Sequence, residues 1–384
     1  MRASSLKLLV FVLLTLVVGA FAQSAYSASA TDQFYLKLPA GIPADLWSYF
    51  IPRDNPLTQA KVELGRQLFF DKRLSADGSV SCSSCHDPRF AFADGKTTAV
   101  GIGGRRGARN TPTVLNAMFN STLFWDGRVD SLEAQTKEPL INPDEMGNRS
   151  HEQVDKRIAA IPEYSRQFQN VFGGPANVDL LSKAIASYER TLVSANSPFD
   201  RLLGGDRKAL SEPAQRGLNL FRTKARCTVC HNLNQSFPFL TDGNYRNTGI
   251  AANFADFKLL SQRATALSSE GSGTNVSMLN EQKGKQELGR FLVSGNALDI
   301  GSFRTPTLRN VELTAPYFHD GSAATLADVI RYYVRGGNER ATRDWELQPV
   351  DLSESEQRDL IEFLKSLTSD DARGKTGHGE GETR

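Results

Sequence analysis

Runs of lysine and arginine interleaved with aromatic residues are absent from this sequence of 384 residues, and its formal net charge is only +2. Proteins that follow a phosphate backbone use such runs, so nucleic acid is not expected as a partner. Strand-like alternation of apolar and polar residues is also scarce. The length and the 40% hydrophobic composition predict a soluble chain of two domains, mostly helical.

The N-terminus has the pattern of a secretory signal peptide. Two basic residues, Arg2 and Lys7, precede an apolar run that is too short for a comfortable membrane span and ends in Ala20-Phe21-Ala22. We expect cleavage after Ala22, or alternatively after Ala30, so that residues 1–22 are removed. The mature chain is then periplasmic, with no stable membrane insertion; an uncleaved anchor is the alternative.

No cysteine is left over for ordinary disulfides. All four lie in two units of the pattern C-x-x-C-H, which are Cys82, Cys85 and His86, and Cys227, Cys230 and His231. This spacing is the attachment signature of c-type haem, in which both cysteines form thioethers and the histidine ligates iron. A dithiol or a zinc knuckle explains the cysteines but not the paired histidines. The sequence therefore predicts two covalent haems, with His86 and His231 as iron ligands.

The chain repeats itself around these units. G-x-x-L-F occurs before each unit, at 65–69 and 217–221. T-P-T follows at 111–113 and 305–307, and an aromatic pair with D-G at 124–127 and 318–321. Both later motifs are displaced by 194 residues. We expect two cytochrome c-like haem domains related by internal duplication, the second with a longer insert over roughly 233–300 that is functional or mobile.

Amphipathic helices are predicted at five places, LTQAKVELGRQLFF, LLSKAIASYERTLV, EPAQRGLNLFR, TLADVIRYYVRG and EQRDLIEFLKSL. The stretch from Ala195 to Gln215 contains Pro198 and two adjacent glycines, which is typical of a connection between domains. We therefore expect an N-terminal domain over 31–200, a C-terminal domain over 201–370 and a disordered tail over 371–384.

The displacement of 194 residues makes the two sites unequal, because it aligns Pro139 with Tyr333. Tyr333 shares a helix face with Leu326 and Ile330. If this helix crosses its haem, Tyr333 can ligate the second iron, whereas proline leaves the first iron open. The other interpretations are a core role for Tyr333, or Met278 or His319 as the ligand. Neither competitor has an equivalent in the first copy.

These motifs resemble the bacterial dihaem cytochrome c peroxidase family, and within it the MauG-like branch. The resemblance extends from VELGRQLFFDKRLS through RNTPTVLNAMFNSTLFWDGRVDSLEAQ to FRTPTLRNVELTAPYFHDGSAATLADV, nearly the whole mature chain. It implies a tyrosine ligand at Tyr333 where orthodox members carry methionine. It also implies a first haem that is open without reductive activation, because Ile102 stands where many members carry a displaceable histidine.

Further site residues follow from the resemblance alone. Gln135, Pro139 and Glu145 match residues that line the peroxide pocket of the first haem, with Glu145 as the acid and base. Trp125 matches a tryptophan between the haems that carries electrons. Asn110, Thr314 and Pro316 match an interhaem calcium site of oxygen donors. His151 and His378 match nothing and are expected at the surface.

The resemblance implies an enzyme that uses hydrogen peroxide to form a high-valent dihaem state and oxidises a partner protein, plausibly at aromatic side chains, by long-range electron transfer. One alternative is a peroxide-detoxifying cytochrome c peroxidase reduced by a small cytochrome c or cupredoxin. The other is a dihaem electron carrier without catalysis. Tyr333, the open haem and the missing histidine favour the first hypothesis.

Overall fold

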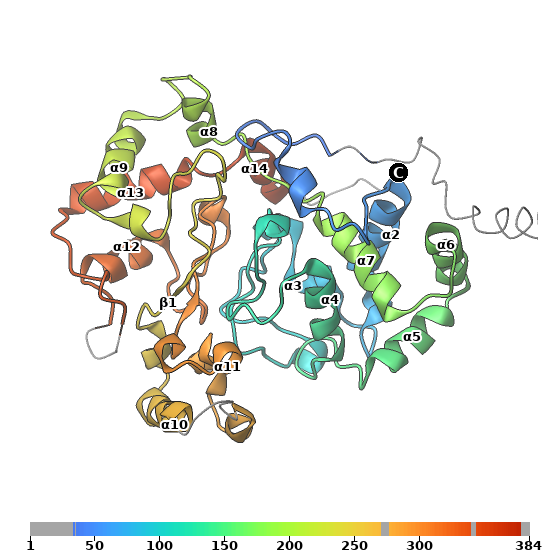
Figure 1. Ribbon diagram of the computed structural model, residues 1–384. Coiled ribbons are helices and arrows are strands. Elements are labelled where there is room, and N and C mark those ends of the chain that lie inside the picture. The colour runs from blue at the N-terminus through green and yellow to red at the C-terminus, as the bar shows by residue number, and fades with distance from the viewer. Residues whose placement is uncertain (1–33, 35, 270–275, 339–342, 378–384) are drawn as a thin grey trace, which may run out of the picture.

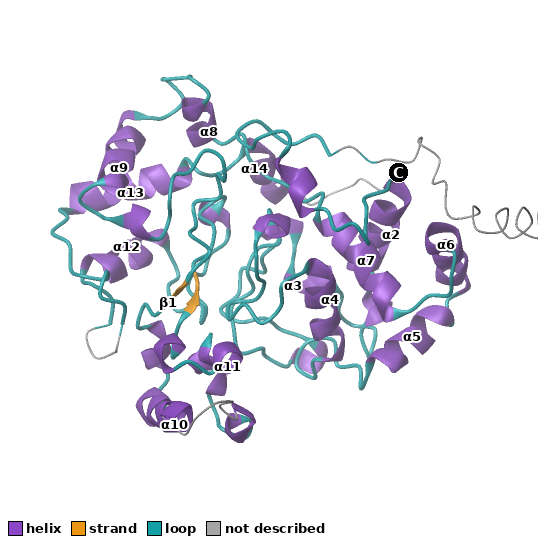
Figure 2. Ribbon diagram, viewed as in Figure 1, coloured by secondary structure: helices purple, strands orange, loops and turns teal. Residues whose placement is uncertain are grey.

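The chain folds into two helical lobes that lie side by side, as the computed structural model shows for residues 34, 36–269, 276–338 and 343–377 (Figure 1). The predicted signal peptide and His378 lie outside these residues. Helices and loops make up nearly all of it (Figure 2). The helices are α2 (Gln59–Phe70), α3 (Cys82–Cys85), α4 (Leu132–Ile141), α5 (His151–Ala159), α6 (Pro162–Phe172), α7 (Val178–Glu189), α8 (Pro198–Leu203), α9 (Glu212–Arg222), α10 (Phe257–Ser269), α11 (Phe291–Ser294), α12 (Leu326–Val334), α13 (Glu354–Lys365) and α14 (Asp370–Gly377).

All five predicted helices are present, as α2, α7, α9, α12 and α13. Each begins where a polar side chain accepts a hydrogen bond from a free backbone N–H of the first turn. Thr325 does so at the start of α12, and Ser353 at the start of α13. In both, the acid three residues later returns a hydrogen bond to the cap, which completes a capping box.

Each lobe is built on one pair of crossed helices, α2 on α7 in the first and α9 on α13 in the second. Glycine allows both crossings. A Cβ atom on Gly65 would lie 1.9 Å from the carbonyl oxygen of Ala184, and one on Gly217 would lie 2.0 Å from that of Asp359. The G-x-x-L-F repeat of the sequence is therefore a close backbone contact repeated in space.

The loops repeat as well. The last threonine of each T-P-T motif donates its hydroxyl to a backbone carbonyl: Thr113 to Ala91 at 2.5 Å, and Thr307 to Phe239 at 2.6 Å. The asparagines that follow, Asn116 and Asn310, both have positive φ angles, 62° and 59°. The fold is mostly helical with two cytochrome c-like domains, as the duplication predicted.

The insert of the second copy is more than a loop. It carries α10, α11 and the two-stranded sheet in which β1 (Tyr245–Arg246) pairs antiparallel with β2 (Phe303–Arg304). Phe257, Leu260 and Phe291 form a small core there, separate from those of the two lobes. Figure 1 shows this unit below the C-terminal lobe. The described part of the insert is therefore a packed element.

The connection and the tail are both more ordered than the sequence suggested. Within the connection, Pro198–Leu203 forms α8, and its Asp200 is bound by Arg309 of the second lobe. The expected disorder from 371 onward is wrong for residues 371–377, which belong to α14, because Ala372 is buried against the N-terminal core. Over the described ranges, no helix has the length and apolarity needed to cross a membrane.

Candidate haem sites

The first C-x-x-C-H unit forms a single helical turn that ends at its histidine. Ser81 caps α3, and the backbone N–H of His86 donates to the carbonyl oxygen of Cys82 at 2.9 Å. The ring atom Nδ1 of His86 lies 3.1 Å from the carbonyl oxygen of Phe92. A carbonyl can only accept, so Nδ1 carries the proton and Nε2 is left with a lone pair for a metal.

The second unit repeats this geometry. The backbone N–H of His231 donates to Cys227 at 2.9 Å, and Nδ1 of His231 lies 2.9 Å from the carbonyl oxygen of Leu240. Burial lowers the pKa of both imidazoles, His86 and His231. Both rings are therefore neutral near pH 7, which is the form that ligates iron.

A large apolar cavity lies beside the second unit, between it and α12. About 1860 Å³ there, open mouth included, contains no protein atoms, which suits a porphyrin. Cys227, Cys230 and His231 border it on one side, and Tyr333 and Leu326 line it from α12. The donors and the space fit the haem that the motif requires.

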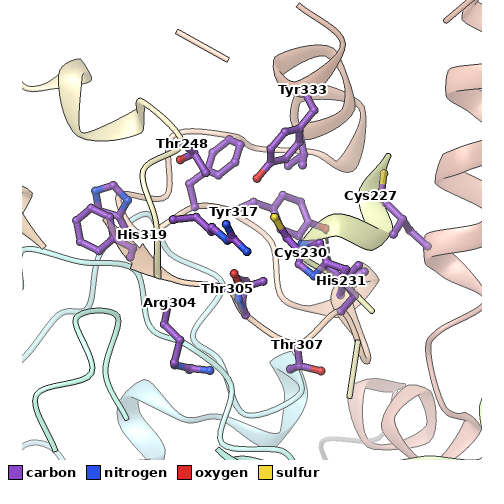
Figure 3. Close-up of a pocket in the computed structure, with 18 of the residues that line it drawn as sticks. Cys227, Cys230, His231, Thr248, Arg304, Thr305, Thr307, Tyr317, His319 and Tyr333 are labelled. Atoms are coloured by element: carbon purple, nitrogen blue, oxygen red, sulfur yellow. Dashed lines mark hydrogen bonds between the residues drawn. The ribbon is translucent and has the colours of Figure 1, made fainter. Parts of the chain in front are cut away.

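Tyr333 turns its hydroxyl toward the space that Cys230 and His231 border (Figure 3). Burial, and then the nearby sulfurs, hold the pKa of this hydroxyl well above its usual value. Its neighbour Tyr332 instead donates to the backbone of Thr248 at 2.7 Å. Of the two adjacent tyrosines, Tyr333 is therefore the one presented to the cavity.

The two competing ligands are placed differently. His319 lines the cavity, but its Nε2 lies 2.8 Å from a carboxylate oxygen of Glu287, and its ring stacks on Phe303 with centroids 3.6 Å apart. Met278 is 63% exposed and does not line the cavity. His319 is thus already occupied, and Met278 is remote from this cavity.

In the first lobe, α4 occupies the place that α12 has in the second. Gln135 and Pro139 lie one helical turn apart on α4, and the backbone N–H of Met146 donates to Pro139 at 3.2 Å. This turn brings Glu145 back toward the haem motif, where its charge acts on Cys82 and Cys85. Asn142 donates to the Glu145 carboxylate at 2.8 Å. Burial raises the pKa of Glu145 above its ordinary 4.5.

Trp125 belongs to the first lobe but lines the cavity of the second unit. Its indole Nε1–H donates to the backbone carbonyl of Asn110 at 2.9 Å, and its ring meets that of His319 edge to face. Asn110, Thr314 and Pro316 line the same cavity. The amide nitrogen of Asn110 donates to Lys96 at 2.9 Å, which leaves its amide oxygen available.

The remaining predicted positions lie elsewhere. His151 is half-buried and hydrogen-bonds through Nε2 to the backbone of Lys137 at 3.1 Å. The backbone N–H of Ile102 donates to the carbonyl oxygen of Glu145 at 2.9 Å, so this loop is attached to the segment that carries Glu145. Sequence reasoning missed Glu189, a fully buried acid close to Cys82. A resemblance between TLVS after Glu189 and SLTS near residue 366 was the available signal.

Two haem-attachment units, each presenting a neutral histidine within a repeated helical lobe, define a dihaem c-type protein. Residues 59–208 match the family model described as di-haem cytochrome c peroxidase. Methylamine utilization protein MauG of Methylorubrum extorquens is 38% identical over 323 residues, 84% of this chain and 82% of that protein. Cytochrome-c peroxidase IdrP1 of Denitromonas iodatirespirans is 38% identical over 360 residues, 92% of each chain.

The fold has solved counterparts. A crystal structure of a MauG-like protein associated with microbial copper homeostasis aligns with a TM-score of 0.68 and 31% identity, covering 87% of this chain and 94% of that one. The chain belongs to the dihaem cytochrome c peroxidase family. It is a haem-dependent oxidoreductase that acts on peroxide, carries two haems, and exchanges electrons with a redox partner or substrate.

Proposed function

We propose that this protein is a periplasmic enzyme that takes up hydrogen peroxide at its first haem and uses it to oxidise aromatic side chains of an exported partner protein. The observation that carries the proposal is the difference between the two lobes at one helical position. Tyr333 on α12 presents a buried hydroxyl to the cavity of the second unit, whereas Pro139 stands at the equivalent position on α4. Proline has no side-chain donor, so the first iron keeps an open face.

Bound haem supplies the redox chemistry, in which peroxide removes two electrons from the protein. Glu145 supplies the proton chemistry. Its carboxylate accepts the proton of the bound oxygen and returns it to the leaving oxygen, which requires one acid within hydrogen-bond reach and a pKa shifted toward neutrality. Burial provides that shift, and Asn142 orients the carboxylate.

Tyr333 and Trp125 carry the rest of the role. A tyrosine oxygen is a hard anionic donor that stabilises oxidised iron, which suits the second haem to storing an oxidising equivalent. Binding iron requires the hydroxyl to lose its proton, and iron supplies the positive charge that offsets the burial of the resulting anion. Trp125 extends from the first lobe into the cavity of the second, where an oxidisable ring can pass electrons between the haems.

Asn110, Thr314 and Pro316 are proposed as protein ligands of an interhaem calcium ion, through the amide oxygen of the first and the backbone carbonyls of the others. All three line one cavity, and oxygen donors of this kind suit calcium. Since Asn110 also accepts the Trp125 indole hydrogen bond, the ion would hold the tryptophan in place.

Stoichiometric peroxide added to the diferric protein tests the proposal, with both haems followed by absorption and Mössbauer spectroscopy. Prompt oxidation of both haems, without a reductant, is expected. Replacing Tyr333 by Met tests the ligand: the low-spin spectrum of the second haem should change. An unchanged spectrum would exclude Tyr333 as the ligand. Tyr332→Phe is the matched control, because that tyrosine hydrogen-bonds to backbone instead.

A peroxide-detoxifying cytochrome c peroxidase is the second candidate. The observation that favours it is the match to a relative named cytochrome-c peroxidase, as identical as the relative named MauG and over more of the chain. Under this function the diferric protein would need reduction by one electron before it reacts, and a small cytochrome would be oxidised at a catalytic rate. Inertness of both forms toward peroxide would contradict both functions.

A further inference from the structure

Glu189 is a buried acid that the proposed reaction does not use. It is the last residue of α7, is only 4% exposed, and its oxygen Oε2 is buried without a hydrogen-bond partner among the described residues. A buried carboxyl without partners is costly, so its presence points to a function or to a group that lies beside it.

The duplication shows which position Glu189 takes in its lobe. Between α7 and α13 the two copies are displaced by 175 residues, as the glycine contacts establish. Gly65 packs on the carbonyl oxygen of Ala184 just as Gly217 packs on that of Asp359.

Two backbone contacts after these helices have the same displacement. The backbone N–H of Asn116 donates to Leu192 at 2.8 Å, and that of Asn310 donates to Leu367 at 3.1 Å. The side-chain oxygens of the same asparagines accept from residues 194 and 369, at 2.9 and 3.0 Å. The register between α7 and α13 is therefore established by independent contacts.

This register aligns Glu189 with Leu364. Leu364 is 5% exposed and lines the cavity of the second haem unit. Glu189 thus occupies a haem-lining position of the first lobe, where the second lobe has a hydrocarbon side chain. Its charge acts on the Cys82 sulfur, to which the first haem is attached, and is second only to burial in raising the pKa of that thiol.

The charged groups around Glu189 do not neutralise it. Arg190 forms two hydrogen bonds of 2.8 Å with Glu133 on α4, so its charge is already paired. Burial raises the pKa of Glu189 to about 8, with Arg190 opposing the rise and Glu133 adding to it. Glu145, which also acts on Cys82, is the other acid of the site. Near neutral pH the carboxyl is therefore poised between its two states.

We infer that Glu189 is a redox-linked acid of the first haem, which holds a proton while the iron is ferrous and releases it when the iron becomes ferric. One electron passes from the haem to an external oxidant, and one proton passes from the carboxyl to water. The added positive charge on iron favours the carboxylate, and the coupling is reciprocal, so the carboxylate in turn favours ferric iron. The inference rests on the first haem being attached at Cys82, Cys85 and His86.

Redox titration of the first haem in the holoprotein, from pH 5 to 9 with mediator dyes, tests this inference. In the wild type, the oxidised-to-reduced ratio at a fixed potential should rise with pH by up to tenfold per unit, equivalent to 59 mV for a one-electron couple. Glu189→Gln should remove this dependence. Glu189→Leu, the residue that the second lobe uses, should do the same. Glu163→Gln, at an exposed acid on α6, is the matched control and should leave the dependence unchanged.

Two outcomes would overturn the inference: a pH dependence that survives in both Glu189 variants, or one that is lost only in Glu145→Gln. A measurement on the wild type is independent of variant folding. The infrared difference spectrum between its oxidised and reduced forms should show a carboxyl losing its proton on oxidation, and absence of that signal would also refute the inference. Haem content by mass and absorption separates the failures, because a first haem missing from the wild type would contradict the proposed function instead.

Discussion

Replacing Asp200 by Asn should destabilise the C-terminal lobe strongly. Asp200 lies on α8 and receives two hydrogen bonds of 2.8 Å from the guanidinium of Arg309. The side chains are 2% exposed for Arg309 and 1% for Asp200. Ser197 also donates to the same carboxylate, at 2.8 Å from both its backbone and its hydroxyl. Asparagine keeps the shape of this contact but leaves the guanidinium buried without its counter-charge.

The magnitude follows from what remains after the substitution. Removing one partner of a buried ion pair costs about 3–5 kcal/mol, because the other charge stays buried and uncompensated. Since 1.4 kcal/mol is about tenfold, the folding equilibrium should fall by roughly two to three orders of magnitude or more. Urea unfolding of the holoprotein, followed by circular dichroism, measures this change.

An exposed ion pair supplies the control. Glu354 and Arg358 are 3.7 Å apart on α13, with side chains 91% and 69% exposed. Glu354→Gln should cost no more than about 0.5 kcal/mol. If Asp200→Asn destabilised the protein no more than this control, the argument from burial would be wrong.

The effect of Asp200 should also depend on pH. Burial by itself raises the pKa of this carboxyl, but the hydrogen bonds and charge of Arg309 outweigh burial and lower the pKa below its ordinary 3.8. Its stabilisation is therefore complete above the unfolded pKa and is lost as pH falls through the lower, folded pKa. The difference between wild type and variant should shrink only in that acid range.

Three further predictions concern the haem sites and the helix crossings. Glu145→Gln should slow the reaction with peroxide by about 10²–10⁴-fold, and should abolish the fall in wild-type rate as pH drops through the raised pKa of Glu145; stopped-flow absorption measures both, with exposed Asp144→Asn as control. Gly217→Ala should cost about 1–3 kcal/mol or more in urea unfolding, whereas Gly174→Ala, with open space around it, should change stability little. Asn110→Ala should lower the calcium content of purified protein by metal analysis; an unchanged content would remove Asn110 from the proposed site.

The local motifs were strong enough to predict much of this molecule. The haem units, the glycine of each crossing and the capped helices depend on covalent chemistry and on neighbours close in sequence, so they were identifiable without coordinates. The displacement of 194 residues also correctly aligned α4 with α12, which begin at the equivalent caps Ser131 and Thr325.

That single displacement failed beyond α12, and Glu189 was missed for this reason. Between α4 and α7 the first lobe contains two further helices, α5 and α6, whereas the second lobe connects α12 to α13 without a helix in its described residues. The register therefore changes from 194 to 175 residues. Only contacts in space, such as glycine on a carbonyl oxygen, reveal the second register.

The sequence by itself determined that two haems are attached and that the two copies differ at Pro139 and Tyr333, because thioether formation and side-chain identity are properties of the chain. The tertiary structure decided which groups are buried, paired or available. It occupied His319 with Glu287, left Met278 at the surface, and buried Glu189 beside Cys82 without a partner. Those outcomes depend on packing between distant segments, and packing sets the pKa and the charge of each group.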